Sequence, residues 1–165
     1  VDGNARVDII MTAEGAKVIE VNPFMGGANM YKAVKLLTGV SLVEQGLRAM
    51  LGLRVDGGRK PTQVLDYRFI AARYTGHIQK ISGLSRTRRF PGIRHVQMFM
   101  GAGDRVEAPQ GDGYEDIGEI MSIGRTIQEA MERGYAALRR LHLRIFKDNG
   151  RVGRQTGAYL QPKKP

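Results

Sequence analysis

The stretch ARVDIIMTAEGAKVIEVN, residues 5–22, predicts a β-hairpin. Two apolar runs flank the short segment AEG, residues 13–15, whose glycine suits a turn. Polar side chains interrupt both runs, at Asp8 in the first strand and at Glu20 and Asn22 in the second. Carboxylates in strands of this kind need a chemical reason, because burying an unpaired charge is costly.

The length of the hairpin loop decides whether Asp8 and Glu20 face the same side. A two-residue loop at positions 14–15 would pair Asp8 with Val21 and place the carboxylates on opposite faces. A three-residue loop at positions 13–15 would pair Asp8 with Glu20, and its glycine can adopt the positive φ that such loops require. We expect the two carboxylates to be cross-strand neighbours in the second register.

In that register two carboxylates and an amide oxygen converge on one patch, since Val18, Glu20 and Asn22 share a face by strand alternation. Adjacent like charges in a partly dry site are unfavourable, and a divalent cation removes the repulsion. Mg²⁺ prefers hard oxygen ligands, often one or two carboxylates with water and substrate phosphates. The alternative is that Glu20 forms a buried pair with an arginine such as Arg6. The spacing alone leaves both readings open.

The remainder of the chain predicts an α+β fold with a mainly antiparallel sheet flanked by helices. Two short helices are expected over residues 28–37 and 41–51, with Gly39 ending the first and Ser41 capping the second. After Pro61, apolar segments separated by glycine turns predict antiparallel strands. These segments cover residues 63–73, 76–82, 93–100, 104–108 and 116–124.

A helix over residues 126–146 is expected to close the fold, because Thr126 and Glu129 form a capping box. Its apolar residues recur at helical spacing and should face the sheet. The stripe consists of Ile127, Met131, Leu138, Leu141 and Ile145. From Lys147 the chain is polar and basic, which predicts a mobile tail whose removal costs about 1 kcal/mol or less.

Composition narrows the classes of function. The sequence has no cysteine, which excludes disulfides and thiolate zinc sites, and an intracellular, cytoplasmic setting is the default. The three histidines are scattered, no P-loop is present, and no apolar run is long enough to cross a membrane. The net charge of +10 favours anionic partners such as nucleotides, phosphates or nucleic acid. The basic cluster RTRR, residues 86–89, is more often a solvated loop than a phosphate contact.

The hairpin and the segments after it resemble the C-terminal part of the ATP-grasp domain of ligases. Residues 5–47 carry an acidic residue, a Glu-x-Asn twelve residues later and the sequel TGVSLV, as that family does. Residues 76–141 are similar to the C-terminal lobe of biotin-carboxylase-like members, and more so to the L-amino acid ligase and carboxylate–amine ligase branch. The resemblance implies an ATP-grasp portion over residues 1–146, followed by the tail at 147–165.

The resemblance implies an ATP-dependent ligase that makes an acyl phosphate, which an amine then attacks. Asp8, Glu20 and Asn22 would bind Mg²⁺, or Mn²⁺ in its place, and Glu20 and Asn22 would thereby hold ATP. Gly26 and Gly27 would let substrate approach the backbone N–H groups. The other partners would be a carboxylate substrate and an amine acceptor.

The match to the family has two departures. Family members usually carry an arginine two residues after the asparagine, where this chain has Phe24, and Arg94 matches a substrate-binding arginine of the biotin-carboxylase type. The family's ATP-binding lysines, phosphate-covering loop and adenine-binding acid lie upstream of the matched region. We therefore expect these segments in the same or a partner chain, and expect this chain alone to be inactive. We also expect that the chain can form a homodimer, and we expect no membrane partner.

Two rival functions come from the same residues. Phe24 suggests a non-catalytic ATP-grasp relative that binds a nucleotide or acidic ligand without turnover. The net charge suggests a basic nucleic-acid-binding module, although the sequence has no tryptophan and no aromatic stacking motif of the single-strand-binding kind.

Overall fold

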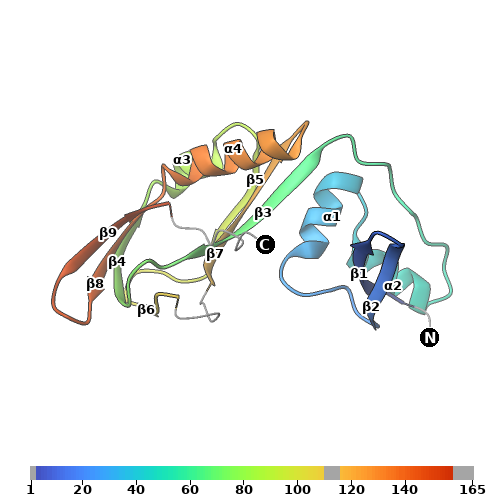
Figure 1. Cartoon of the computed structure of the whole chain (residues 1–165), viewed down its shortest axis with the longest axis horizontal. Helices are drawn as coiled ribbons and strands as arrows, with labels where there is room; N and C mark the ends of the chain where they lie inside the picture. The colour runs from blue at the N-terminus through green and yellow to red at the C-terminus, as the bar shows by residue number, and fades with distance from the viewer. Residues whose placement is uncertain (1–2, 110–115, 158–165) are drawn as a thin grey trace. The chain divides into compact units, whose positions relative to one another are not determined.

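The computed structural model describes residues 3–109 and 116–157. The chain divides into two compact units, Val1–Thr62 and Gln63–Pro165, which we describe separately (Figure 1). Within the described residues, no helix is long and apolar enough to cross a membrane.

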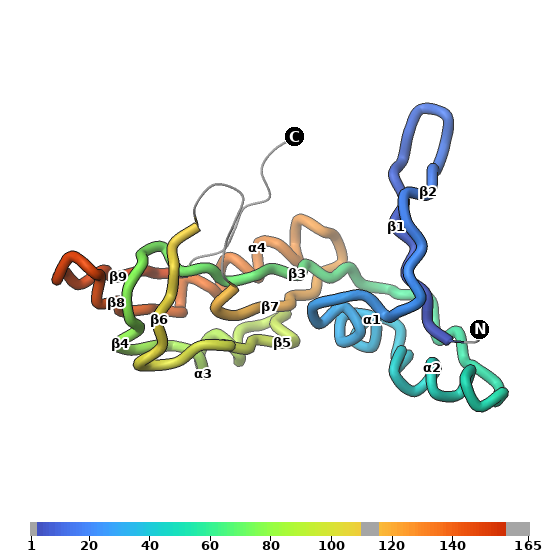
Figure 2. The backbone as a smooth tube through the Cα atoms, turned by 90° about the horizontal axis from the view of Figure 1, so that it is seen from below, coloured from blue at the N-terminus to red at the C-terminus, as the bar shows by residue number. Residues whose placement is uncertain are grey.

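The first unit contains the hairpin and two short helices. Strands β1 (Arg6–Thr12) and β2 (Gly15–Asn22) form a two-stranded antiparallel sheet. They precede α1 (Met30–Thr38) and α2 (Leu42–Met50). Figure 2 shows the hairpin extending away from both helices, which agrees with the exposure of most of its side chains.

The helix ends in this unit lie where the sequence predicts them. Gly39 ends α1 in the left-handed conformation, at φ 80°, where a residue with a Cβ atom would be strained. The Ser41 hydroxyl accepts a hydrogen bond from the Glu44 backbone N–H at the start of α2. Among the described residues of this unit only Ala33 and Gly46 are buried, so its apolar core is small.

The second unit contains two antiparallel sheets and two helices. A three-stranded sheet has the order β3 (Val64–Ala71), β7 (Asp116–Gly124), β5 (Ile93–Met98). A four-stranded sheet has the order β6 (Arg105–Val106), β4 (Gly76–Ser82), β8 (His142–Lys147), β9 (Val152–Thr156). The helices are α3 (Leu84–Arg88) and α4 (Ile127–Leu138). The expected α+β class with antiparallel pairing is confirmed.

Helix α4 covers one face of the three-stranded sheet and positions the core (Figure 1). The Thr126 hydroxyl caps it by accepting from the Glu129 backbone N–H, as the capping box predicts. The Ser122 hydroxyl of β7 donates to the Ala130 carbonyl at 2.7 Å, which fixes the helix on the sheet. The largest fully buried apolar side chains of the core are Ile70, Ile78, Ile117, Ile120, Met121, Leu138, Leu141, Leu143 and Ile145.

The closing helix is shorter than the sequence predicts. It ends at Leu138, and residues 142–147 form strand β8 instead. Leu141 and Ile145 fit a helical spacing, but with Leu143 they also fit a spacing of two that alternates with polar residues. The strand wins because β8 pairs with both β4 and β9. Ile127, the first residue of the predicted stripe, is 51% exposed.

The tail prediction is wrong for residues 147–157. Strand β9 lies in this segment and pairs with β8 along its whole length. Gln155 is buried, and its side chain accepts from the Arg73 N–H at 2.6 Å and donates to the Ala71 carbonyl at 3.0 Å. These polar contacts anchor the segment. Because the segment has few apolar residues, the sequence pattern does not predict its place in the sheet. Residues 158–165 lie outside the described residues.

The basic cluster at residues 86–89 lies largely on a helix. Leu84–Arg88 form α3, and Thr87 is fully buried, with its hydroxyl bonded to the Gly83 carbonyl. The expected loop is therefore wrong, because residues 84–88 are helical and pack against α4 and β5, but the three arginines are exposed, as a solvated segment requires.

Candidate functional site

The hairpin turn sets the register of the acidic residues. The structure closes it with a two-residue loop at positions 13–14, one residue shorter than the loop that we expected. Gly15 starts β2 at φ 108°, so the predicted positive φ is confirmed. The Thr12 hydroxyl stabilises the turn by donating to the Gly15 carbonyl and accepting from the Glu14 N–H.

A bulge brings the two carboxylates opposite each other. Thr12 pairs with Gly15 at the turn, but the register shifts by one residue between Ile9–Val18 and Asp8–Glu20, which leaves Ile19 as the extra residue. Asp8 and Glu20 are thus direct partners on one face, as predicted, although the reason is a bulge and not a longer loop.

The bulge also separates a polar face from an apolar face. Val18 pairs with Ile9, so it lies on the face opposite Glu20, which contradicts the predicted sharing of a face. The polar face carries the pairs Arg6–Asn22 and Asp8–Glu20. The apolar face carries Val7, Ile9, Met11, Val18 and Val21, all of them exposed.

Arg6 lies between the acidic side chains. Its Nη2 is 3.1 Å from Asp8 Oδ2 and 3.9 Å from Glu20 Oε2. The Asp8 and Glu20 side chains are 42% and 53% exposed, so the pair with arginine exists but is not the buried one considered from the sequence. The Asn22 amide nitrogen donates to Glu20 Oε1 at 2.5 Å, which places the third predicted ligand beside the pair.

The segment after β2 folds back on Arg6. The Arg6 guanidinium lies 5.1 Å from the centre of the Phe24 ring, a cation–π contact. Gly26 has φ 88°, and a Cβ atom there would lie 3.3 Å from Arg6 Cδ. A Cβ atom built on Gly27 would have no described atom within 4 Å. Of the two predicted substrate-binding glycines, Gly26 therefore lies beside Arg6, whose close approach it allows.

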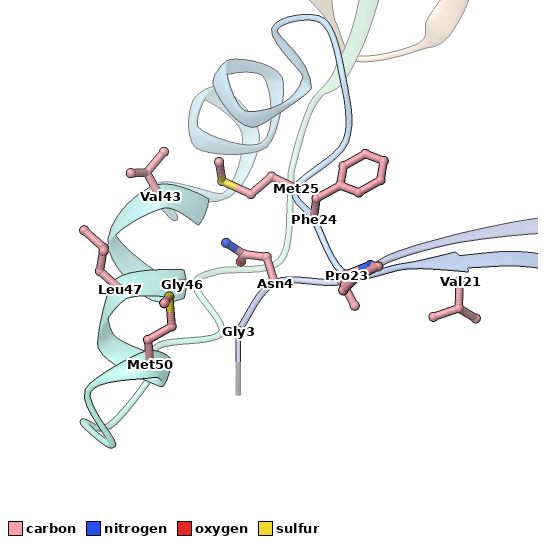
Figure 3. Close-up of a pocket in the computed structure, with 11 residues that line it drawn as sticks. Gly3, Asn4, Val21, Pro23, Phe24, Met25, Val43, Gly46, Leu47 and Met50 are labelled. Atoms are coloured by element: carbon pink, nitrogen blue, oxygen red, sulfur yellow. The ribbon is translucent and has the colours of Figure 1, made fainter. Parts of the chain in front are cut away.

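An apolar hollow of about 560 Å³ adjoins the hairpin on the side of α2 (Figure 3). Asn4 is the one polar side chain among the described residues that line it, and the Asn4 Nδ2 donates to the Leu42 carbonyl. The side chains around it offer packing but no convergent charges. The lining residues are Gly3, Asn4, Ala5, Val21, Pro23, Phe24, Met25, Val43, Gly46, Leu47 and Met50.

Arg94 lies in the second unit, in strand β5. The register of β5 with β7 shifts between Ile93 and His95, so Arg94 is the extra residue of a bulge. Its side chain is exposed and lines an open depression of about 400 Å³ together with Arg88 and Gln97. An exposed guanidinium at a bulge is available to an anionic ligand.

A buried polar network in the second unit was missed by sequence reasoning. Glu119 is fully buried, and Tyr67 donates to its Oε2 at 2.5 Å, while His95 Nε2 lies 2.6 Å from its Oε1. Burial and the charge of Glu119 raise the pKa of Asp116 on the same strand. A glutamate inside the apolar run DIGEIMSIG, residues 116–124, was the available signal.

Comparisons with known proteins bear on the fold. Residues 68–145 match the family model of L-amino acid ligase C-terminal domain 2. The L-amino acid ligase of Bacillus licheniformis superposes with a TM-score of 0.66 at 23% identity, over 84% of this chain and 35% of that chain. The chain has the fold of the C-terminal part of ATP-grasp ligases.

Other ATP-grasp structures share this fold. Phosphoribosylglycinamide synthetase from Anaerococcus prevotii gives a TM-score of 0.69 at 13% identity, over 84% of this chain and 36% of that chain. N5-carboxyaminoimidazole ribonucleotide synthetase from Thermotoga maritima gives 0.57 at 18% identity, over 86% of this chain and 37% of that chain. A curated relative, the uncharacterized protein y4rH of Sinorhizobium fredii, is 24% identical over 121 residues, 73% of this chain and 25% of that protein. The chain thus spans between a quarter and two fifths of the length of these relatives.

The ligand chemistry of the acidic hairpin differs from that of an all-protein metal cage. Among residues 3–109 and 116–157, no group of three or more His, Cys, Asp or Glu side chains could hold a metal ion. The hairpin carries two carboxylates and one amide, so any ion held there would have to complete its shell with other oxygen ligands such as water.

Proposed function

We propose that this chain is the C-terminal section of an ATP- and Mg²⁺-dependent carboxylate–amine ligase. The observation that carries the proposal is the pairing of Asp8 with Glu20 on one face of the hairpin, beside Asn22, in a chain with the ATP-grasp fold. The similarity to L-amino acid ligases supports an amino acid as one substrate.

The proposed reaction has two steps. The terminal phosphoryl group of ATP moves to a substrate carboxylate oxygen, and ADP leaves. The amine nitrogen then attacks the carbonyl carbon of the acyl phosphate, inorganic phosphate leaves with the carbon–oxygen bond electrons, and the nitrogen loses a proton. Such chemistry depends on positioning and on charge neutralisation, which is what the polar hairpin face offers.

The residues of the polar face fit Mg²⁺ by donor chemistry. Asp8 and Glu20 supply carboxylate oxygens, and Asn22 supplies an amide oxygen once its side chain turns, since its nitrogen now faces Glu20. The Arg6 guanidinium is within ion-pair distance of both carboxylates and must move aside for the ion. When bound, the ion would neutralise charge between the carboxylates and the phosphates of ATP.

Arg6 is proposed to replace the arginine that ATP-grasp members usually carry at the position of Phe24. It is the cross-strand partner of Asn22, and its guanidinium rests on the Phe24 ring. Movement of Arg6 from the carboxylates to the substrate, as the ion enters, would provide a positive charge near Gly26 and Gly27. Arg94 is the second proposed contact to the substrate.

The exposed apolar face of the hairpin is the proposed contact for the N-terminal ATP-grasp segments, in the same or a partner chain. Five large apolar side chains form a continuous row on it, and such patches usually mark an interface. A homodimer that buries the same face is the alternative assembly. We propose that the ATP-binding lysines come from those segments, so that this chain alone does not turn over ATP.

Titration of Mn²⁺ followed by electron paramagnetic resonance tests the metal site on the 165-residue chain. Asp8→Asn and Glu20→Gln should each weaken Mn²⁺ binding, since each exchanges a carboxylate for a neutral amide. Glu44→Gln is the matched control, because it removes a carboxylate of the same unit from a pair with Arg48. Equal Mn²⁺ affinity in all four proteins would refute the metal site. In the longer ligase, Glu20→Gln should slow ADP release by ~10²–10³.

The second candidate function is a non-catalytic ATP-grasp relative that binds nucleotide or an acidic ligand. It is favoured by the Arg6 guanidinium, which already forms an ion pair with Asp8 and lies 3.9 Å from Glu20, and by Phe24. Binding of ATP by the longer protein with no Mg²⁺-dependent ADP release, across amino acid substrates, would establish this candidate.

A further inference from the structure

A row of three cations crosses the exposed face of the four-stranded sheet. Lys80 of β4 is the direct partner of Arg144 of β8, and Arg144 is the direct partner of Arg154 of β9. Direct partners lie on the same face of a sheet, and all three side chains are exposed. Neighbouring strands are ~4.8 Å apart, so the row spans roughly 10 Å.

A bulge in β4 places Lys80 on this face. The register shifts between the pairs Ile78–Ile145 and Lys80–Arg144, which leaves Gln79 as the extra residue. Without the shift, Lys80 would stand opposite Leu143, whose side chain is buried. The bulge therefore brings Lys80 into line with Arg144 and Arg154.

The row has no internal counter-charge in the part of the chain that the structure describes. Strands β4, β8 and β9 contain no acidic residue, and no described carboxylate forms an ion pair with Lys80, Arg144 or Arg154. Asp148, the acid closest in sequence to Arg144 and Arg154, pairs with Arg105 at 3.0 Å. Like charges directly opposite each other destabilise a sheet, so an external anion would relieve the repulsion.

Hydrogen-bonding groups lie beside the row. A second row lies two residues away from the cations on each of the three strands. It consists of Ser82, His142 and Thr156, which are direct partners across the sheet. The His142 Nδ1 and Thr156 Oγ1 are 3.1 Å apart. Both rows line an open depression of about 340 Å³, a volume that suits a small molecule.

We propose that this face binds the oligophosphate chain of a small molecule. Three cations across roughly 10 Å match two or three linked phosphate groups, and the hydroxyls and imidazole can donate to the remaining oxygens. Among the described residues the row ends at both sides, because β9 is an edge strand and β6 pairs only with Gly76 and His77 of β4. A nucleic acid strand needs a longer track, so a short ligand fits better. The site uses residues 80–82 and 142–156 only, and is independent of the proposed Mg²⁺ site.

Calorimetric titration of the full chain with inorganic triphosphate, in the presence of a chelator, tests the proposal. Arg144→Gln with Arg154→Gln should weaken binding about 100-fold, at roughly tenfold per lost charge-assisted contact. Arg139→Gln with Arg151→Gln is the matched control, because both arginines are exposed, lie outside the row and change the net charge equally. Arg144→Lys with Arg154→Lys should retain most of the affinity.

Four further outcomes decide the interpretation. Asp8→Asn with Glu20→Gln should leave triphosphate binding intact, which separates this site from the proposed ligase site. Equal weakening by the matched control, or no binding by the unaltered chain, would overturn the proposal. A single-stranded oligonucleotide that binds more tightly than triphosphate, with the same dependence on Arg144 and Arg154, would overturn it in favour of a nucleic-acid surface.

Discussion

Single residues decide how the acidic pair behaves. The Arg6 guanidinium contacts both carboxylates and the Phe24 ring, so the chain carries its own counter-ion to Asp8 and Glu20. An internal cation and an external metal ion compete for the same oxygens. Metal affinity therefore depends on Arg6 as well as on the ligands.

Arg6→Gln should raise the Mn²⁺ affinity of the chain several-fold, because it removes the competing charge. The melting temperature should change little, since half-exposed ion pairs contribute about 0–1 kcal/mol. Paramagnetic titration and thermal unfolding of the same samples measure both effects. Arg48→Gln, which breaks the pair with Glu44, controls for the lost charge. Weaker Mn²⁺ binding in Arg6→Gln would show that Arg6 supports the site and does not compete for it.

Asp116 predicts a pH dependence of stability. Burial and the nearby Glu119 raise the pKa of Asp116, and its Oδ1 is buried with no hydrogen-bond partner among the described residues. With the folded pKa above the unfolded one, the native state binds more protons, so this contribution is favourable at low pH and is lost as pH rises through the folded pKa.

Asp116→Asn should therefore stabilise the protein at pH 7, by on the order of 1 kcal/mol, because no charge is buried. The gain should disappear as the pH falls to about the ordinary carboxyl value near 4. Urea unfolding of both proteins from pH 4 to 8 measures the difference. A gain that is constant across this range would mean that ionisation of Asp116 is not its cause.

The sequence predicts these residues unevenly, for physical reasons. The cross-strand pairing of Asp8 with Glu20 could be predicted, because carboxylates that interrupt an apolar strand are conspicuous. The bulge at Ile19 was not found, because an apolar β-branched residue is equally suited to a regular strand. The network of Glu119 with Tyr67 and His95 was missed, because its members are far apart in the sequence.

At the scale of elements, the segment after α4 shows where local patterns mislead. Residues 142–147 suit a helix or a strand by spacing, and only pairing with β4 decides between them. Strand β9 has few apolar residues, so sequence reasoning assigned it to a tail. Its register and the buried Gln155 show that it completes the sheet.

Gln155→Leu should destabilise the second unit by about 2–3 kcal/mol, because it leaves the Arg73 N–H and the Ala71 carbonyl without their partner in a buried place. Gln128→Leu is the control, since Gln128 is exposed on α4. Chemical denaturation measures both variants. Truncation after Phe146 removes the same contacts and should cost more than the 1 kcal/mol expected from a tail. A loss below 1 kcal/mol in Gln155→Leu would contradict this role.

At the scale of the molecule, the two units differ in their apolar cores. The second unit buries a large set of aliphatic side chains between its sheets and α4. The first unit buries only Ala33 and Gly46 among its described residues. Small domains with little buried surface are marginal, so the units should differ in autonomous stability.

Residues 63–165 alone should unfold in one cooperative thermal transition, whereas residues 1–62 alone should show none. The reason is that the apolar surface buried within each segment must offset the entropy of ordering the chain. Circular dichroism during heating of the two fragments measures this. A sharp transition in residues 1–62 alone would mean that the hairpin and its helices hold together by contacts beyond the two buried residues.

The apolar hairpin face has a consequence for handling the protein. A two-stranded sheet has unpaired N–H and C=O groups along both edges, and here one of its faces is also apolar and exposed. Chains produced without a partner that covers this face can associate by pairing their edge strands. The substitution Ile9→Lys would place a charge on the apolar face and oppose this association. Light-scattering particles that form from the isolated chain at high concentration would then indicate an uncovered hairpin. They would not indicate a physiological assembly.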